Sequence, residues 1–555
     1  MLYQDALQQT SICTNDITKP SIPEVLFNIH PRLLFEEIND IYEDCEKLQA
    51  LVWQEIMMRA QGTKIWQKYA FDKIDSLKTW QEKMPFTSYG DYRELIAENM
   101  AEDNEQLFHG KAKMYIATTG STGNLKYFPE SPAGDAAKQL VMAIRGMYMA
   151  GLLPVTLDMD AKNMTISNYA SLGESGQGKL IVRASGQTAR NMRKKTGTMN
   201  IMPQEFLEAD DLSAEDRNYL MGVYALAEKR FAKIFCNNLY HFSELLRVIK
   251  MHSLQMIEDV HTGIFSIELS ERTRNSLAPT FAANPARADE LRQIAQKNNN
   301  ILADTPENIA LIWPNLEMTG CWLSATVGRD ARETLAMLPK RVQSIDLGYG
   351  ASEGKFNIPL KLNTPFGAIA PFAMVYEFLS MEDGKCYWAW EVEDGKYYEL
   401  IITTYSGLYR YRLGDIVQIG GFVGKTPLIK FCGKRAEAFN LNGQTIYGFE
   451  LSDTIVEVEK ALGLRLDLVQ FYADNEGYDL IVQHLPEDAA ALFADEARKA
   501  CKDEFGVAPR HIYRVSDDYK LSLFRERVRP DRTVCGIKLP MMLAEMPADK
   551  ILQML

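Results

Sequence analysis

The sequence predicts a mixed α/β protein that has a large amino-terminal domain and a small carboxy-terminal domain. Three observations predict this class. The chain has 555 residues, which is too long for one hydrophobic core. Short β-rich pieces alternate with helical stretches between residues 100 and 430. The segment after residue 433 has a different pattern, typical of a compact α/β module.

The first element is an amphipathic helix near the amino terminus. Its apolar residues recur at steps of four and three, at Leu34, Ile38, Ile41, Cys45, Leu48 and Val52. This spacing predicts one long helix that packs on its own domain. A dimerising coiled coil is the alternative, but the pattern covers only about three heptads.

The body of the chain mixes both kinds of element. MYIATT (114–119), MTISNYA (164–170) and KLIVRASG (179–186) are typical of strands, and AAKQLVMAIRGMYMAGLL (136–153) is typical of a helix. A long polar helical zone follows, up to about residue 300. The mixture favours an α/β or α+β body over a sandwich or a bundle.

The carboxy-terminal segment predicts a helix, a hairpin, a second helix and a strand. These lie at 448–463, at 466–473 and 478–485 joined by the turn DNEG, at 486–506, and at 511–515. A domain boundary near Gly433 fits this order, because it comes just after the strand-like LIKFC. We therefore expect domains at 1–432 and 433–555.

Composition excludes several classes of function. The chain has 61 Lys and Arg against 74 Asp and Glu, a net charge of −13, which argues against nucleic-acid binding. The basic run at 190–195 is interpreted as a solvated face, with a polyanion site as the alternative. The amino terminus resembles no export signal, and no apolar run reaches about 18 residues, so we expect no membrane association. Eight cysteines without CxxC spacing favour a cytoplasmic protein without a zinc site.

The stretch TTGSTGNLK (118–126) is the first candidate site. Glycine lets the backbone turn so that N–H groups converge on an anion, and hydroxyls and a lysine add donors and charge. Its spacing does not match the GxxxxGK[ST] phosphate loop, and an ordinary surface turn is the alternative. The candidate phosphate-binding residues are Thr118, Thr119, Gly120, Ser121, Thr122 and Lys126.

The second candidate is LGYGASEG (347–354). Here Ser352 could contact a phosphate oxygen, Glu353 could bind a divalent cation on that phosphate, and Tyr349 could stack on a base. A glycine-rich turn with a solvated glutamate is the alternative.

Two further candidates lie nearer the carboxy terminus. Alternation between Leu408 and Leu413 predicts a strand that ends at a turn at Gly414, which places Asp415 at the strand end. A carboxylate there could accept hydrogen bonds from a ribose diol, or could simply cap the turn. The last candidate is Lys538 in DRTVCGIKLPM (531–541); a lone lysine of this kind is usually solvated.

Taken in order, TTGSTGNLK, YGASE, YRLGD and Lys538 resemble the four landmarks of the adenylate-forming superfamily. That superfamily includes acyl-CoA ligases, peptide synthetase adenylation domains and luciferases. The stretches MPFTSYGDYRELI (84–96), LIWPNLEM (311–318), VYEFL (375–379) and 397–435 resemble the Gretchen Hagen 3 family of acyl-acid amido synthetases. The resemblance extends from about residue 80 to 540.

This resemblance implies a ligase that works in two steps with ATP and Mg2+. A carboxylic acid attacks the α-phosphate to give an acyl-adenylate and pyrophosphate, and an amine, such as an amino acid, then displaces AMP. Such chemistry depends on positioning and charge neutralisation. The resemblance implies that residues 118–126 bind phosphate, that Tyr349 lies beside the base and that Asp415 binds the ribose. It implies that Ser352 contacts the α-phosphate and that Glu353 binds the metal. Further ATP contacts are implied for Gly350, Arg412 and Lys434, and a catalytic role for Lys538.

The resemblance also implies sheets and a small barrel in the large domain, and a small domain that moves about a hinge at 433–436. We expect residues 160–330 to set acyl specificity. The chain departs from the family pattern at AFNLNGQTIYGFEL (438–451), where Gly443 and Glu450 are similar to acyl-CoA ligases, at Met541 after Pro540, and at Val375. A thioester-forming acyl-CoA ligase is therefore the alternative, and a non-catalytic nucleotide-binding protein is a third reading. We expect a monomer or weak dimer.

Overall fold

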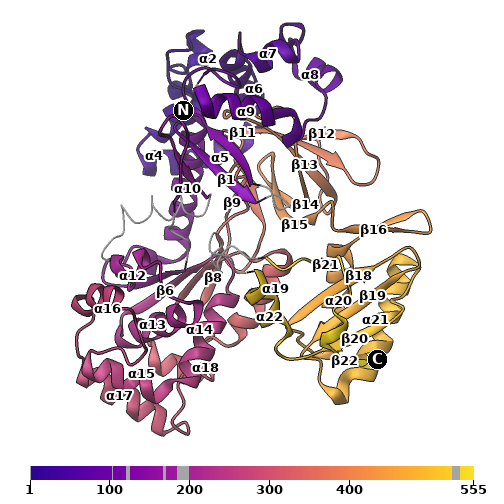
Figure 1. Cartoon of the computed structure of the whole chain (residues 1–555). Helices are drawn as coiled ribbons and strands as arrows, with labels where there is room; N and C mark the ends of the chain where they lie inside the picture. Colours follow the sequence, from indigo (N-terminus) through magenta and orange to yellow (C-terminus); the bar gives the residue numbers. More distant parts are fainter. Residues whose placement is uncertain (1, 103, 120–124, 167–170, 184–198, 528–537) are drawn as a thin grey trace. The chain divides into compact units, whose positions relative to one another are not determined.

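The computed structural model describes the whole chain except residues 1, 103, 120–124, 167–170, 184–198 and 528–537 (Figure 1). It contains two compact units, and each is described by itself. The first comprises residues 1–159, 167–198 and 344–431, and the second comprises 160–166, 199–343 and 432–555. Both combine helices with sheets, which confirms the predicted mixed class.

The first unit begins with a series of helices. They are α1 (Leu2–Leu7), α2 (Ser11–Thr14), α3 (Ile22–Phe27), α4 (Pro31–Glu36), α5 (Ile38–Glu43), α6 (Cys45–Ala60), α7 (Lys64–Lys68), η1 (Phe71–Lys73), α8 (Leu77–Lys83), α9 (Tyr89–Glu102), α10 (Pro132–Leu152) and η2 (Pro154–Thr156). The predicted single helix over Leu34 to Val52 is wrong, because this stretch forms α4, α5 and the first half of α6. The breaks fall at Glu37 and Asp44, whose ψ angles of 3° and 19° leave the helical range. All six stripe residues are nevertheless buried.

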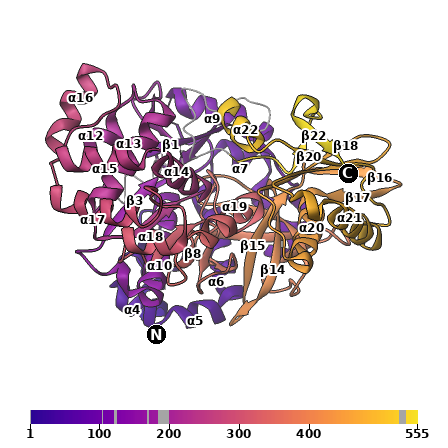
Figure 2. The same ribbon diagram turned by 90° about the horizontal axis from the view of Figure 1, so that it is seen from below.

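Two sheets complete this unit. The smaller has the order β2-β1-β5-β4, formed by β1 (Met114–Thr119), β2 (Leu125–Glu130), β4 (Ser171–Glu174) and β5 (Leu180–Val182). The larger has the order β12-β11-β13-β14-β15-β10-β9, and its two long strands β14 and β15 run side by side (Figure 2). Its strands are β9 (Asn357–Pro359), β10 (Gly367–Ile369), β11 (Met374–Ser380), β12 (Cys386–Trp388), β13 (Tyr397–Thr404), β14 (Tyr411–Val423) and β15 (Thr426–Lys434).

The beginning of β14 is fixed by Thr87, which lies between α8 and α9, and by Tyr92 of α9. The hydroxyls of Thr87 and Tyr92 donate to the carbonyl of Tyr409 at 2.7 and 2.9 Å, and the N–H of Thr87 donates to the carbonyl of Arg410 at 2.9 Å. The Tyr409 ring is buried against Phe71 at 5.1 Å in an edge-to-face contact. Burial of such rings contributes about 1.5–3 kcal/mol each, so this core holds the strand in place.

The second unit contains strands β3, β6 and β7, of which β3 pairs with β6 and β6 with β7 in parallel. Strands joined through helices in this way produce a sheet with helices packed on it. The strands are β3 (Lys162–Ile166), β6 (Phe231–Cys236) and β7 (Met318–Cys321), and β8 (Gln343–Asp346) begins at the residue before the first unit resumes. The helices are α12 (Gln204–Glu208), α13 (Ala214–Ala227), α14 (Tyr240–Met251), α15 (Ser253–Thr262), α16 (Glu271–Leu277), η3 (Ala278–Thr280), α17 (Pro285–Gln296), α18 (Pro306–Ile312) and α19 (Ala325–Ala336).

The carboxy-terminal part follows the predicted order. Helix, hairpin, helix and strand appear as α20 (Gly448–Leu462), β18 (Leu468–Ala473) with β19 (Tyr478–Gln483), α21 (Ala490–Phe505) and β20 (Ile512–Val515). Gly506, the last residue of the predicted helix at 486–506, caps α21 in the left-handed conformation at φ 71°. The remaining elements are β16 (Ala438–Leu441), β17 (Gln444–Tyr447), η4 (Glu487–Ala489), α22 (Tyr519–Arg527), β21 (Met542–Leu543), η6 (Ala548–Lys550) and β22 (Ile551–Met554).

Strands β18 to β22 form a sheet of order β21-β18-β19-β20-β22, and α20 packs beside α21 (Figure 1). Residues 438–447 form a tight hairpin with Asn442 and Gly443 at positive φ, as its two-residue turn requires. Within the described parts of the chain, every helix is too short or too polar to span a lipid bilayer.

Candidate nucleotide and acyl-activation site

The two ends of the predicted phosphate loop belong to the paired strands β1 and β2. Thr118 pairs with Lys126 and Thr119 with Leu125 in the antiparallel register, so the hairpin brings the two ends of TTGSTGNLK together. Lys126 Nζ lies 5.4 Å from the centre of the Tyr89 ring. The candidate residues Gly120, Ser121 and Thr122 lie outside the described residues.

The YGASE loop follows β8 and carries Tyr349, Gly350, Ser352 and Glu353. Gly348 turns the backbone at φ 81° directly before it. The Tyr349 ring stacks on Phe431 with centres 5.3 Å apart, and its hydroxyl donates to Oδ2 of Asp415 at 2.5 Å. The fold of the first unit therefore joins the predicted base-side residue to the predicted ribose ligand.

Asp415 lies inside a strand and not at its end. Residues 408–410 lie outside the strand, with Arg410 at φ 44°, and β14 runs from Tyr411 through Asp415 to Val423. The predicted strand over 408–413 with a terminating turn at Gly414 is therefore wrong. Instead Gly414, at φ 68°, accompanies a register shift between β13 and β14, and such a bulge re-aims side chains next to a site.

The two arginines of this region pair with buried carboxylates. Arg412 makes two hydrogen bonds to Glu399, of 2.9 and 2.6 Å, and the Glu399 side chain is 1% exposed. Arg410 makes an ion pair of 3.0 Å with Glu377 and donates to the Met84 carbonyl. The guanidinium of Arg412 is thus held by the sheet of the first unit, whether or not nucleotide also contacts it.

A small cavity in the first unit adjoins Glu353 and has room for about one water molecule. Its charged lining residues are Glu130, Lys138, Glu353 and Lys355. Glu130 is fully buried, and burial raises its pKa although Lys138 pairs with it. Burial, together with the nearby Arg145 and Lys138, lowers the pKa of Lys355 to about 7.

The carboxylate of Glu353 fits a magnesium ion that is bound together with phosphate. Among the described residues there is no group of three or more His, Cys, Asp or Glu side chains placed to hold a metal. Magnesium does not need such a cage, since one or two carboxylates and the substrate phosphates are its usual ligands. Glu353 would provide that carboxylate.

The remaining candidates, Lys434 and Lys538, belong to the second unit. Lys434 is the last residue of β15 and is exposed. Lys538 is also exposed, and its Nζ lies 4.4 Å from the ring centre of Trp322, directly after β7. The contact is a cation–π interaction within the second unit.

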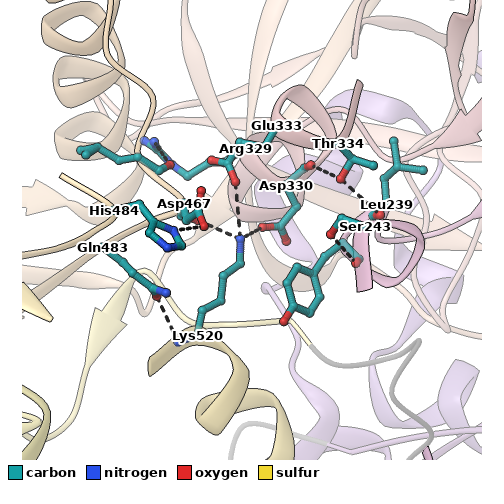
Figure 3. A network of polar contacts seen from close by, with 12 residues as sticks. Leu239, Ser243, Arg329, Asp330, Glu333, Thr334, Asp467, Gln483, His484 and Lys520 are labelled. Atoms are coloured by element: carbon teal, nitrogen blue, oxygen red, sulfur yellow. Dashed lines mark hydrogen bonds and ion pairs between the residues drawn. The ribbon is translucent and has the colours of Figure 1, made fainter. Parts of the chain in front are cut away.

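The second unit also contains a buried ionic cluster that the sequence patterns did not predict. Lys520 of α22 is 5% exposed and lies 2.5 Å from Asp330 and 3.8 Å from Glu333, both on α19 (Figure 3). Nearby, Arg329 pairs with Glu459 of α20 at 2.7 Å. Burial raises the pKa of Glu333 to about 8, opposed by Lys520.

His484 and Asp467 form the outer edge of this cluster (Figure 3). The hydrogen bond that the His484 ring donates to the Asp467 carboxylate raises the pKa of His484. The carbonyl of Asp467 also accepts from Lys520 at 2.8 Å. The cluster therefore joins the carboxy-terminal part to α19 inside one unit.

Family models assign the chain. The model of the GH3 family N-terminal domain matches residues 34–330, and that of the GH3 family central domain matches 367–434. The chain belongs to the GH3 family. This confirms the resemblance to the Gretchen Hagen 3 proteins inferred from the motifs.

Relatives of this GH3 protein include plant enzymes. It is 22% identical over 530 residues to indole-3-acetic acid-amido synthetase GH3.4 of Arabidopsis thaliana, which covers 86% of this chain and 83% of the relative. It is 20% identical over 479 residues to 4-substituted benzoates-glutamate ligase GH3.12 of the same plant, with 80% and 79% covered. The solved structure of GH3.15 acyl acid amido synthetase matches with a TM-score of 0.77 at 16% identity, covering 94% and 97% of the two chains. The fold is thus that of an acyl acid amido synthetase.

Proposed function

We propose that this GH3-family chain is an ATP-dependent ligase that joins a carboxylic acid to the amine of an amino acid. The substrate carboxylate attacks the α-phosphorus of ATP, and the bond to pyrophosphate breaks. The amine then attacks the acyl carbon of the adenylate, loses a proton, and releases AMP as the C–O bond breaks. The single observation that carries this proposal is the Tyr349–Asp415 hydrogen bond, which unites two of the family landmarks in one site.

Each candidate site residue of the first unit has a proposed part in the adenylation step. The Tyr349 ring, stacked on Phe431, offers a face for the adenine, and Asp415 can accept from the ribose hydroxyls because a carboxylate has several acceptor positions. Thr118, Thr119, Ser121, Thr122 and Lys126 would hold the β- and γ-phosphates with the N–H groups around Gly120. Ser352 and the backbone at Gly350 would contact the α-phosphate. Charge neutralisation of this kind dominates such reactions.

A bound magnesium ion, held by Glu353, would supply charge neutralisation on the phosphates. The protein's own task is to orient the α-phosphorus and to keep Glu353 in place beside Ser352, which is 8% exposed. Arg412 and Lys434 are proposed as further ATP contacts.

The proposal extends to two domains, 1–432 and 433–555, with a hinge at 433–436. The small domain would carry Lys538 to the adenylate during activation, and domain motions of this kind take about microseconds to milliseconds. Support comes from the position of Lys434 at the very end of β15 and from the exposure of Lys538. We propose a cytoplasmic monomer or weak dimer.

A thioester-forming ligase remains the second candidate because of the 438–447 hairpin. Its Asn442-Gly443 turn lies in the stretch that is similar to acyl-CoA ligases. Both candidates share the first step and differ only in the acceptor.

The test is a product assay with purified protein, Mg-ATP and a panel of aromatic, fatty and small hydroxy or keto acids. Each acid is supplied with each amino acid in turn and with coenzyme A, and products are identified by mass. Pyrophosphate release that depends on one acid, with an amide mass for one amino acid, supports the proposal. A coenzyme A thioester without any amide would overturn it, and so would ATP binding without pyrophosphate release from any acid.

A further inference from the structure

Helix α10 carries two basic residues that reach the YGASE loop within the first unit. They are Lys138 and Arg145, seven residues apart and hence on one face of the helix after two turns. Neither belongs to a family landmark. Basic side chains of a helix are usually solvated, but Arg145 is only 6% exposed and the Lys138 side chain 14%.

Arg145 holds the start of the loop, at Tyr349, and the start of β9, at Asn357, by their backbone carbonyls. Its Nη2 donates to the carbonyl of Tyr349 at 3.0 Å and to that of Asn357 at 2.5 Å, and its Nε donates to Asn357 at 2.9 Å. The side chain of Asn357, fully buried, accepts from the N–H of Tyr349 at 2.7 Å. Tyr349 is thus fixed at its N–H and at its carbonyl.

The guanidinium also fills the space beside Gly348. A Cβ at this position would lie 2.3 Å from Cζ of Arg145, so the turn before Tyr349 and the arginine are matched to each other. A positive φ of 81° independently favours glycine there.

Lys138 holds the other end of the motif. Its Nζ donates to the carbonyl of Ser352 at 3.1 Å and pairs with Glu130. Glu130 in turn accepts from the hydroxyl of Ser406 at 3.0 Å. The lysine is therefore itself held in place, which a positioning role requires.

We propose that Arg145 and Lys138 are positioning residues that shape the YGASE loop for ATP, acting through the backbone of Tyr349 and Ser352 without touching the nucleotide. This rests on the proposed function of the loop. A preformed loop avoids the entropy cost of ordering it when ATP binds. Loss of either contact should therefore weaken ATP binding, whereas loss of a comparable buried contact elsewhere should lower only the thermal stability.

The first test is Arg145→Lys, because one ammonium cannot span two carbonyls as a guanidinium does. The matched control is Arg287→Lys in the second unit: Arg287 is also buried and donates to two carbonyls, those of Leu226 and Ile312. Dissociation constants for Mg-ATP are measured by calorimetry and Tm by scanning calorimetry. We expect Arg145→Lys to weaken ATP binding at least tenfold, and Arg287→Lys to lower Tm without changing ATP binding.

The second test removes Lys138 without leaving a buried charge. In the double variant Lys138→Met/Glu130→Gln, a fivefold or greater loss of ATP affinity is expected, whereas Lys113→Met, which removes the ion pair with Asp135 of the same helix, should leave ATP affinity unchanged. Equal ATP affinity in wild type and both folded loop variants would overturn the inference, as would an equal loss in the controls. Failure of the wild-type protein to bind ATP would instead overturn the proposed function.

Discussion

The hydroxyl of Tyr349 donates a hydrogen bond of 2.5 Å to Asp415, 66 positions further along the chain. One residue belongs to the loop after β8 and the other to β14, next to a bulge. The contact fixes the tyrosine ring and the carboxylate relative to each other, as the proposed joint role in nucleotide binding requires. Tyr349 therefore makes two interactions, the stacking of its ring on Phe431 and the hydrogen bond of its hydroxyl to Asp415, and each can be tested separately.

Tyr349→Phe keeps the ring that stacks on Phe431 and removes the hydrogen bond. One hydrogen bond to a charged group contributes about 1.5–3 kcal/mol, and the ribose hydroxyls of bound ATP can replace part of the lost bond to Asp415. We therefore expect ATP affinity to fall about fivefold. Asp415→Asn should weaken ATP binding further, since the ribose loses a charged acceptor. Calorimetric titration with Mg-ATP checks both, and unchanged affinity in Asp415→Asn would exclude the ribose role.

Arg412 and Glu399 form a pair whose loss should affect stability. Arg412→Met leaves the buried Glu399 carboxylate without this partner, so we expect a lower Tm and a loss of about 2–4 kcal/mol in the free energy of unfolding. Adding Glu399→Gln should recover most of it. Chemical denaturation measures both variants; a double variant as unstable as the single one would contradict the expected coupling.

Lys520 is the central charge of the ionic cluster in the second unit. Lys520→Met leaves the buried Asp330 and the partly buried Glu333 without their cation, and we expect the unfolding free energy of this unit to fall by about 3–5 kcal/mol. Lys499→Met is the control, since Lys499 of the same part is exposed. A loss for Lys520→Met no larger than that of the control would show that the cluster adds nothing to stability.

Glu333 gives the same cluster a pH dependence. Its pKa is raised to about 8 in the folded state by burial, so the folded protein holds a proton that the unfolded chain has released above its ordinary pKa of 4.5. Stability from this group is full below that ordinary pKa and is lost as pH rises toward 8, with a slope of up to about 1.4 kcal/mol per pH unit. The hydrogen bond to Asp467 raises the pKa of His484 above its ordinary value of 6.5. The free energy of unfolding that His484 contributes is therefore also lost as the pH rises, from about 6.5 upward.

Glu333→Gln should therefore flatten the fall of unfolding free energy between pH 5 and 8. Denaturant melts at several pH values measure the slope. An identical slope in wild type and variant would mean that Glu333 is ionised in the folded protein across this range.

The sequence patterns predicted helices and strands better than they predicted contacts between side chains. The helix, hairpin and helix after residue 448 were predictable because each has its own periodicity and turn residues. The break of the 34–52 helix at Glu37 and Asp44 was not, because the apolar stripe continues through both breaks and all six residues are buried. Periodicity reports which side faces the core and not whether the hydrogen-bond ladder is continuous.

Motifs likewise named Tyr349 and Asp415 separately, but nothing in either stretch indicates that they bond to each other. Lys138, Arg145 and Lys520 went unnoticed because a basic residue in a helix is solvated by default. Their burial follows from carbonyls and carboxylates far away in the sequence. A Gly348 directly before the tyrosine is the one local sign that another group approaches the loop closely.

The most direct test of acyl-adenylate formation is isotope transfer from the acid. The acid that supports pyrophosphate release is prepared with 18O in its carboxylate and incubated with the protein, Mg-ATP and the accepted amino acid. Attack of that carboxylate on the α-phosphorus, followed by cleavage of the acyl C–O bond, leaves one 18O in AMP, and mass spectrometry of the AMP should show a shift of two mass units. Unlabelled AMP, or label in inorganic phosphate with ADP as the other product, would contradict the account.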